Sequence, residues 1–288
     1  MARKFEKASS EYLTLDLTRK LALGNGYDYL PISFFVRYTW GATAAVEDGV
    51  VSWSNPVGTN TYWAIDISAA GIPRMWLRGT CGTVIEATAI GDIRGDGKWH
   101  GALASVRPRD DIDGTRLRFF VDGDKFASQD TANQGAYTAV DDYTSFGIGL
   151  GDYASTPGSW ANVDVAEFAV WHDDLSIADS RALYYQRLSP LFIRPDRLIS
   201  YVTFEADLDF DVVSGVQLAI GGGTPIKTAS PPVIYPDGFN PRGRQVVNPM
   251  TLLHGGYHRK RLRQGKAAAG GPSTRRIKID DAMIVVPG

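Results

Sequence analysis

The chain has 288 residues, of which 44% are hydrophobic and 11% aromatic, and its formal net charge is −2. This length allows one large domain with an appendage, and the many Gly, Tyr and Trp residues are typical of a β sandwich or barrel rather than a helical bundle. The one cysteine, Cys81, excludes an intrachain disulfide, and the sequence has neither an 18-residue apolar run nor a signal-peptide pattern at its N-terminus. We therefore expect a protein that folds in a reducing cytoplasm and has no membrane partner.

The small net charge hides an asymmetry along the chain. Residues 1–240 hold 20 Lys and Arg against 30 Asp and Glu, whereas residues 241–288 hold 10 against 2. An acidic body with a basic tail indicates that the tail meets an acidic surface, on this protein or on a neighbour.

Short apolar runs separated by Gly-, Pro- and Asn-rich turns recur along most of the chain. Several alternate between apolar and polar residues, which is the pattern of strands in an all-β sandwich. The pair Asp122-Gly123 closes one run with the residues that a hairpin turn requires. We predict strands at residues 12–17, 32–40, 50–53, 62–67, 74–78, 99–106, 117–121, 146–150, 163–173, 191–195, 198–204 and 216–220.

One short helix is predicted to start after Ser176. Ser176 can act as its N-cap, and Asp179 three residues later stands in for the Glu of a capping box. Pro190 ends the helix, because the residue before a proline disfavours the helical region. The apolar residues that recur at helical spacing are Ala178, Ala182 and Tyr185.

The last part of the chain differs in composition. Residues 237–288 are rich in Gly, Pro, Arg and Lys, and only Ile277, Ile279 and residues 283–286 have a strand-like pattern. Such a segment cannot bury enough apolar area to fold alone. We therefore divide the chain into a sandwich (1–190), additional strands and an extended segment packing on it (191–236), and a basic extended arm (237–288).

Two stretches carry a resemblance to a known family. Residues 97–130 contain a Trp-His strand followed by a strand that ends in Val-Asp-Gly, and residues 163–173 (VDVAEFAVWHD) precede the short helix. This order resembles the laminin-G-like, concanavalin-A-like jelly roll. Residues 166–236, with their PPVIYP segment, resemble laminin-G-like proteins encoded by bacteriophages and prophages. The resemblance covers residues 8–236 and implies an antiparallel jelly-roll sandwich with one short helix and an extended C-terminal arm, a fold that more often binds glycans or partners than carries chemistry.

Catalysis is not supported by the carboxylates. Retaining glycoside hydrolysis needs two carboxyl groups about 5–5.5 Å apart. Asp164 and Glu167 are three residues apart, so strict alternation places them on opposite faces of a strand. Glu205, Asp207 and Asp209 share one face, which we interpret as a solvated one. We therefore expect no catalytic residues and no enzyme.

Cofactors and metals are not expected either. The four histidines lack the regular spacing of a zinc site, and we assign them structural positions. Calcium is the one ion for which hard oxygen ligands are present, although no calcium-loop motif accompanies them. The candidate ligands are Asp92, Asp96, Asp110, Asp111 and Asp113.

Two sets of residues are candidates for binding. Aromatic residues in or beside loops could stack on a sugar, and these are Trp53, Tyr62, Trp63, Trp76, Tyr153 and Trp160. From them we select Tyr153, Trp160 and Trp63 as the glycan-contact candidates. The cations of the arm could anchor it to another protein, and they are Arg242, Arg244, Arg259, Lys260, Arg261, Arg263, Arg275 and Arg276. Nucleic acid is set aside as a partner, because the body is acidic and few aromatic residues accompany these cations.

These observations predict a non-enzymatic bacteriophage virion protein, either a head decoration or a tail-associated component. It would assemble in the bacterial cytoplasm, reside in the virion, and contact other capsid or tail proteins and copies of itself through its arm. The alternatives are a carbohydrate-binding adhesin that recognises a host surface glycan and a glycoside hydrolase.

Overall fold

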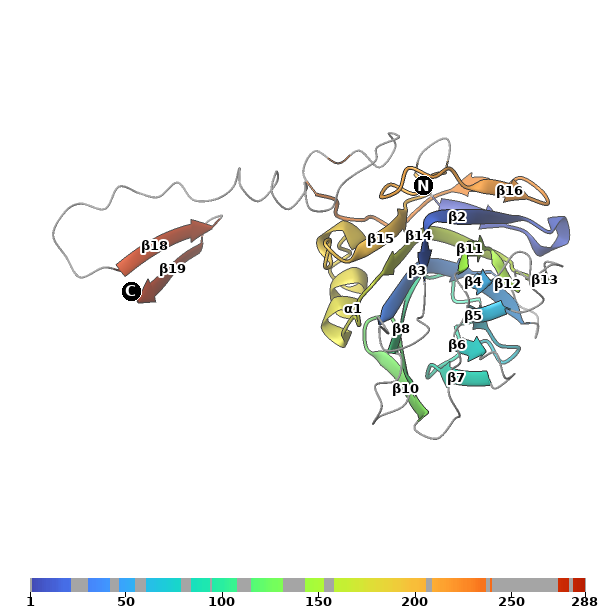
Figure 1. Cartoon of the computed structure of the whole chain (residues 1–288), viewed down its shortest axis with the longest axis horizontal. Helices are drawn as coiled ribbons and strands as arrows, with labels where there is room; N and C mark the ends of the chain where they lie inside the picture. The colour runs from blue at the N-terminus through green and yellow to red at the C-terminus, as the bar shows by residue number, and fades with distance from the viewer. Residues whose placement is uncertain are drawn as a thin grey trace. The chain divides into compact units, whose positions relative to one another are not determined.

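The computed structural model describes residues 2–21, 31–41, 47–54, 61–78, 84–93, 95–107, 115–131, 143–152, 158–205, 209–236, 239, 274–279 and 282–287. The chain divides into two compact units, Met1–Pro249 and Met250–Gly288. The first is a β sandwich, and the second contains a hairpin (Figure 1).

Sheet A has the strand order β10-β9-β8-β3-β14-β1-β17, and β15 pairs with β14 beside this path. All its pairings are antiparallel. Its strands are β1 (Ala2–Phe5), β3 (Ile32–Trp40), β8 (His100–Arg107), β9 (Thr115–Val121), β10 (Lys125–Thr131), β14 (Val163–Trp171), β15 (Leu198–Val202) and β17 (Ile226–Thr228).

Sheet B has the order β16-β2-β11-β4-β5-β6-β7 and is also antiparallel. Its strands are β2 (Tyr12–Leu21), β4 (Asp48–Ser54), β5 (Thr61–Ile67), β6 (Pro73–Arg78), β7 (Val84–Thr88), β11 (Tyr143–Ile148) and β16 (Ala219–Gly221). A separate small hairpin joins β12 (Leu150–Asp152) to β13 (Gly158–Trp160), and a 3-10 turn, η1, covers Lys7–Ser9. The two antiparallel sheets, with one α-helix among the described residues, confirm the predicted jelly-roll sandwich.

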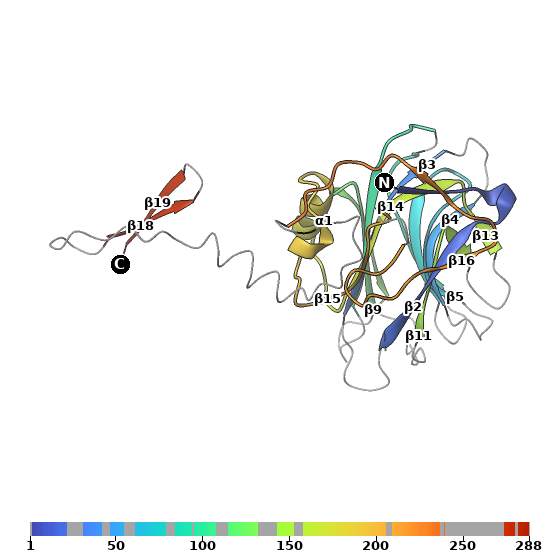
Figure 2. The same cartoon turned by 90° about the horizontal axis from the view of Figure 1, so that it is seen from above.

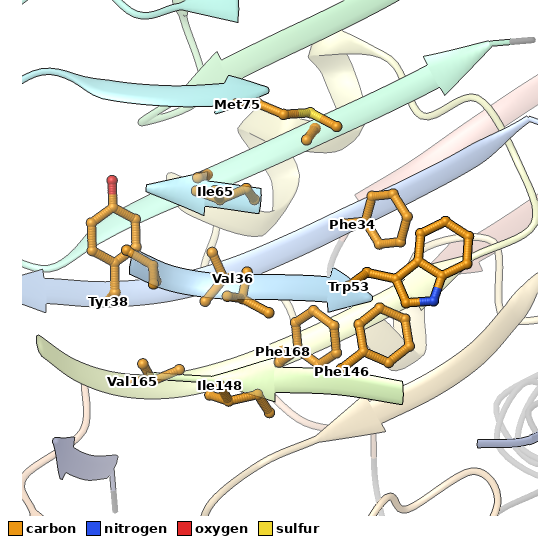
Figure 3. Packing of buried hydrophobic residues seen from close by; sticks show 14 of the residues in the cluster. Phe34, Val36, Tyr38, Trp53, Ile65, Met75, Phe146, Ile148, Val165 and Phe168 are labelled. Atoms are coloured by element: carbon orange, nitrogen blue, oxygen red, sulfur yellow. The ribbon is translucent and has the colours of Figure 1, made fainter. Parts of the chain in front are cut away.

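The hydrophobic core lies between the two sheets. Alternate residues of each strand point inward, and Figure 3 shows side chains from β3 and β14 packed against side chains from β4, β5, β6 and β11. Aromatic rings fill its centre: the rings of Phe34 and Trp63 have centroids 3.9 Å apart, and Trp53 stacks on Phe146 at 6.1 Å. Large aromatic residues bury the most apolar area per side chain, so this cluster stabilises the contact between the sheets.

The predicted turn after β9 is present. Asp122 and Gly123 both have positive φ, 55° and 79°, and the chain then returns as β10. Glycine adopts this conformation without strain, and Asp is among the residues that tolerate it. The returning strand β10 was missing from the strands predicted from the sequence.

Helix α1 (Ile177–Tyr184) begins as predicted, but it buries a different face. Ser176 caps it, and Asp179 completes the capping box. The buried side chains of α1 are Ser180 and Leu183, whereas Tyr185, expected on the apolar face, is 54% exposed. Residues 191–195 were predicted as a strand, yet a 3-10 turn, η2 (Pro190–Phe192), lies there because Pro190 is pre-shaped for a helical start and Ser189 caps it.

A β-bulge in β14 corrects the prediction made for two carboxylates. The register of β14 against β3 shifts between Val165 and Glu167, so Ala166 is the extra residue. Val165 lies in the core before the bulge and Phe168 after it. Asp164 and Glu167 therefore share the outer face of sheet A, whereas strict alternation had placed them on opposite faces.

Glu167 forms a buried ion pair on this outer face. Arg37 Nε donates to Glu167 Oε2 at 2.8 Å, and Arg37 also donates to the carbonyl oxygen of Leu183 in α1 at 2.8 Å. The Tyr201 hydroxyl of β15 donates to the other carboxylate oxygen. The bond to Leu183 holds α1 over the outer face of sheet A, and the bond from Tyr201 links β14 to its neighbouring strand β15.

The strands after the helix extend both sheets. β15 pairs with β14 and β17 with β1 in sheet A, whereas β16 pairs with β2 in sheet B. In the second unit, β18 (Thr274–Ile279) and β19 (Ala282–Pro287) form an antiparallel hairpin, which confirms the two strand-like runs predicted there. Among the described residues, no helix has the length and apolar character needed to cross a bilayer.

Candidate functional site

One row of residues crosses all seven strands of sheet B. Strand register aligns its members, and their chain neighbours on either side include the core residues Phe146, Trp53 and Ile65, so the row lies on the face directed away from the core. The row consists of Ala219, Thr14, Gly147, Ser52, Ala64, Trp76 and Glu86. Its central members are small, and its one aromatic side chain is near the β7 edge.

The small hairpin β12–β13 covers part of this outer face. Gly49 pairs with Asp66 and faces the same side. A side chain at Gly49 would strike the backbone nitrogen of Gly151, which lies 1.8 Å from the position its Cβ would take. β12 also packs against β4 and β5. In Figure 2, α1 and β13 lie on opposite sides of the two sheets. The uncovered part of the face is therefore on β6 and β7.

Trp76 is held in place on this uncovered part. Its side chain is half-buried, and its indole Nε1 donates to Asp66 Oδ2 at 2.8 Å. Arg74 forms two hydrogen bonds to the same carboxylate: its Nε donates to Oδ1 at 2.6 Å, and its Nη2 donates to Oδ2 at 3.1 Å. Burial raises the pKa of Asp66 to about 6, because loss of water around the carboxyl outweighs the bonds from Arg74 and Trp76.

Further carboxylates surround the indole. Glu86 is directly opposite Trp76 in the strand register and is exposed, and Thr88 donates to its Oε1 at 2.9 Å. Glu47 accepts from Arg74 at 2.9 Å. An aromatic ring beside hydrogen-bond acceptors can bind a ligand that has both an apolar face and hydroxyl donors. Both oxygens of Asp66 are already engaged, so it is poorly placed to act as a nucleophile.

The structure describes two of the three predicted glycan-contact residues and places them in different environments. Trp63 is fully buried in the core and cannot touch a ligand, which corrects its selection; its inward position follows from the alternation of β5. Trp160 is half-buried in β13, the hairpin that covers the outer face of sheet B, so it remains a candidate. Tyr153 lies outside the described residues. Trp76 was named among the aromatic residues that could stack on a sugar but was not selected, although its position between Met75 and Leu77 already indicated an outward side chain.

The calcium candidates are not assembled into a site where they are described. Asp92 is exposed, and Asp96 accepts from the backbone N–H of Lys98 at 2.9 Å and lies 3.1 Å from His100. Asp110, Asp111 and Asp113 fall outside the described residues. Within the described part of the chain, no three His, Cys, Asp or Glu residues are grouped as metal ligands would be.

The remaining candidates are the arm cations and the acidic run. Arg275 and Arg276 belong to β18. The other arm cations lie outside the described residues, namely Arg242, Arg244, Arg259, Lys260, Arg261 and Arg263. In the acidic run, Glu205 accepts from Ser230 and Asp209 pairs with Arg3 at 2.8 Å, while Asp207 is not described.

His100 belongs to a buried polar cluster at the start of β8. It is 3% exposed, with Nδ1 3.0 Å from Asp122 Oδ2 and Nε2 3.1 Å from Asp96 Oδ1. A neutral imidazole has one N–H, so only the protonated ring donates to both carboxylates. Burial disfavours this charge, but Asp122 and Asp96 outweigh it and raise the pKa of His100. We therefore assign His100 as a structural cation.

No family model and no curated protein matches the chain. Solved structures do match it. A Bacteroides ovatus protein assigned a carbohydrate-binding role is 14% identical with a TM-score of 0.50, and the match covers 81% of this chain and 61% of that one. A SAP-like pentraxin from Limulus polyphemus is 10% identical with a TM-score of 0.49, covering 64% and 81%. The receptor binding domain of botulinum neurotoxin D is 12% identical with a TM-score of 0.47, covering 64% and 43%.

At these identities the likeness concerns the fold alone. Together with the strand order described above, it places the chain in the structural class of lectin-like jelly-roll sandwiches.

Replacing His100 with Gln should remove the contribution that protonated His100 makes to the free energy of unfolding. The pKa of His100 is higher in the folded chain than the value of about 6.5 in the unfolded chain. Its contribution is therefore complete below pH 6.5 and is lost as the pH rises through the folded pKa. The difference in unfolding free energy between wild type and His100→Gln, measured by urea denaturation from pH 5 to 9, should shrink with rising pH.

Asp96→Asn is the matched control, because it leaves the bond between His100 and Asp122 in place. The difference in unfolding free energy between wild type and Asp96→Asn should also shrink with rising pH, but it should be smaller than that of His100→Gln. A difference that stays constant or grows with pH would contradict the assignment of His100 as a cation.

Proposed function

We propose that this chain is a non-catalytic binding protein whose sandwich recognises a carbohydrate through the outer face of sheet B. The observation that carries the proposal is the half-buried indole of Trp76, fixed by Asp66 and facing Glu86 across the strand pair.

Each part of this arrangement suits a sugar. The C–H face of a pyranose packs on an aromatic ring, and its hydroxyl groups donate to carboxylates, which accept stronger hydrogen bonds than neutral groups. The bond from Trp76 to Asp66 fixes the ring before the ligand arrives, so less conformational entropy is lost on binding. The exposed Glu86 on the β7 side of the indole shows that the surface is open there.

The opposite face of the sandwich offers no equivalent surface where Arg37 and Glu167 lie, because α1 covers it. The carbohydrate-binding assignment of the Bacteroides ovatus protein, which has the same kind of fold, is in keeping with the proposal.

A glycan array followed by calorimetric titration of the best ligand tests this function. Trp76→Ala should weaken binding about tenfold or more, as expected when a central aromatic contact is removed. Trp76→Phe keeps a ring but loses the bond to Asp66, and it should fall in between.

Tyr185→Ala is the matched control, because Tyr185 is an exposed aromatic residue following α1, which packs on sheet A. Its affinity should stay within about twofold of wild type. The proposal fails when wild type binds no glycan, or when Tyr185→Ala weakens binding and Trp76→Ala does not.

A second candidate function is a structural component of a virion, anchored by its C-terminal arm. The observation in its favour is the separate second unit, whose hairpin β18–β19 belongs to a segment with 10 cations against 2 acids. An isolated two-stranded hairpin is marginally stable in water, so this unit calls for a partner surface. The acidic body of a neighbouring copy or another virion protein has the complementary charge.

Deleting residues 241–288 tests the second candidate. Particles assembled in the presence of the truncated chain should contain none of it, while its circular dichroism spectrum and unfolding midpoint should match those of the full-length body. Incorporation at the wild-type level would contradict the anchoring role.

A further inference from the structure

The charges around Trp76 are mostly negative. Asp66 is bonded to the indole, Glu86 faces it in the register, and Glu47 lies beyond Arg74. The cations described beside these groups are Arg74 and Lys7, and both are engaged; the side chain of Arg78, two residues after Trp76 in β6, is not described. Arg74 is held by Asp66 and Glu47, and Lys7 pairs with Asp48 at 3.2 Å.

The body of the chain, apart from the basic arm, has the same sign of charge. Residues 1–240 carry ten more acidic than basic side chains. A surface with an excess of one charge lowers the local concentration of ligands of the same charge and slows their association. An anionic polysaccharide is therefore repelled before it reaches the indole.

We infer that the ligand of this face is an uncharged glycan, built of neutral hexose or N-acetylhexosamine units. Polysaccharides with uronic acid, sialic acid, sulfate or phosphate groups at the stacked unit are excluded. This inference rests on the proposed carbohydrate-binding function and adds the chemical class of the ligand.

The strand geometry places the repulsion at the stacked sugar itself. Directly opposed residues of an antiparallel pair have Cβ atoms roughly 4.5–5.5 Å apart, so the Glu86 side chain starts next to the indole of Trp76. A carboxylate on a sugar over this indole would meet Glu86 and Asp66 at short range. At surface dielectric values, such a contact lowers affinity by about tenfold or more. A neutral hydroxyl at the same place instead donates to these carboxylates.

The test compares two forms of one oligosaccharide. A neutral oligosaccharide that binds wild type is titrated beside the same compound after oxidation of its C6 hydroxymethyl groups to carboxylates. We expect the oxidised form to bind at least about tenfold more weakly at low salt. The difference in affinity between the neutral and the oxidised form should narrow at about 1 M salt, where the Debye length falls to about 3 Å.

Glu86→Gln locates the source of the selectivity. It removes one negative charge beside Trp76, and the gap between the two oligosaccharides should narrow several-fold. Asp196→Asn is the control, because Asp196 is an exposed carboxylate that pairs with Arg197 just before β15 of sheet A. It should leave the difference in affinity between the two oligosaccharides unchanged.

The outcomes separate this inference from the function on which it rests. Equal or tighter binding of the oxidised form overturns the neutral-ligand inference and leaves carbohydrate binding standing. If Glu86→Gln leaves the affinity difference between the two oligosaccharides unchanged, the assignment of this charge selectivity to the Trp76 face is overturned. Absence of binding to any glycan overturns both the inference and the proposed function.

Discussion

The buried ion pair between Arg37 and Glu167 holds α1 over the outer face of sheet A and so leaves sheet B for the proposed ligand. Burying two charges is costly unless every polar atom finds a partner, and removing one partner of such a pair typically costs about 3–5 kcal/mol. Here the guanidinium also reaches the Leu183 carbonyl, and the carboxylate also accepts from Tyr201. The pair therefore holds α1 against sheet A and links the neighbouring strands β14 and β15. It depends on the bulge at Ala166, which turns Glu167 outward.

With sheet A covered there by α1, the proposed binding surface lies on sheet B. Its central strands have Gly147, Ser52 and Ala64 on the outer face, and the small hairpin β12–β13 fits against β4 at Gly49, where a side chain would collide with Gly151. The open part of the face is then β6 and β7. The polar cluster of Asp66, Arg74 and Trp76 occupies it and keeps the indole in a single position.

Much of the fold follows from local patterns in the sequence, whereas the site does not. Alternation located strands such as Ile32–Trp40, and Ser176 with Asp179 located the start of α1. β1, β7 and β10 are short or polar, so their pairing partners rather than their own composition define them. The bulge at Ala166 is invisible to a rule of strict alternation. Trp63 and Trp76 differ only in strand phase, which decides that one is core and the other is surface.

A crystal structure of the chain with its best-binding oligosaccharide tests the central claim most directly. The account predicts a sugar ring stacked on the Trp76 indole, with hydroxyl groups donating to carboxylates of the β5–β7 face. A sugar bound at α1, at the outer face of sheet A or on the C-terminal unit, with Trp76 left bare, would contradict it.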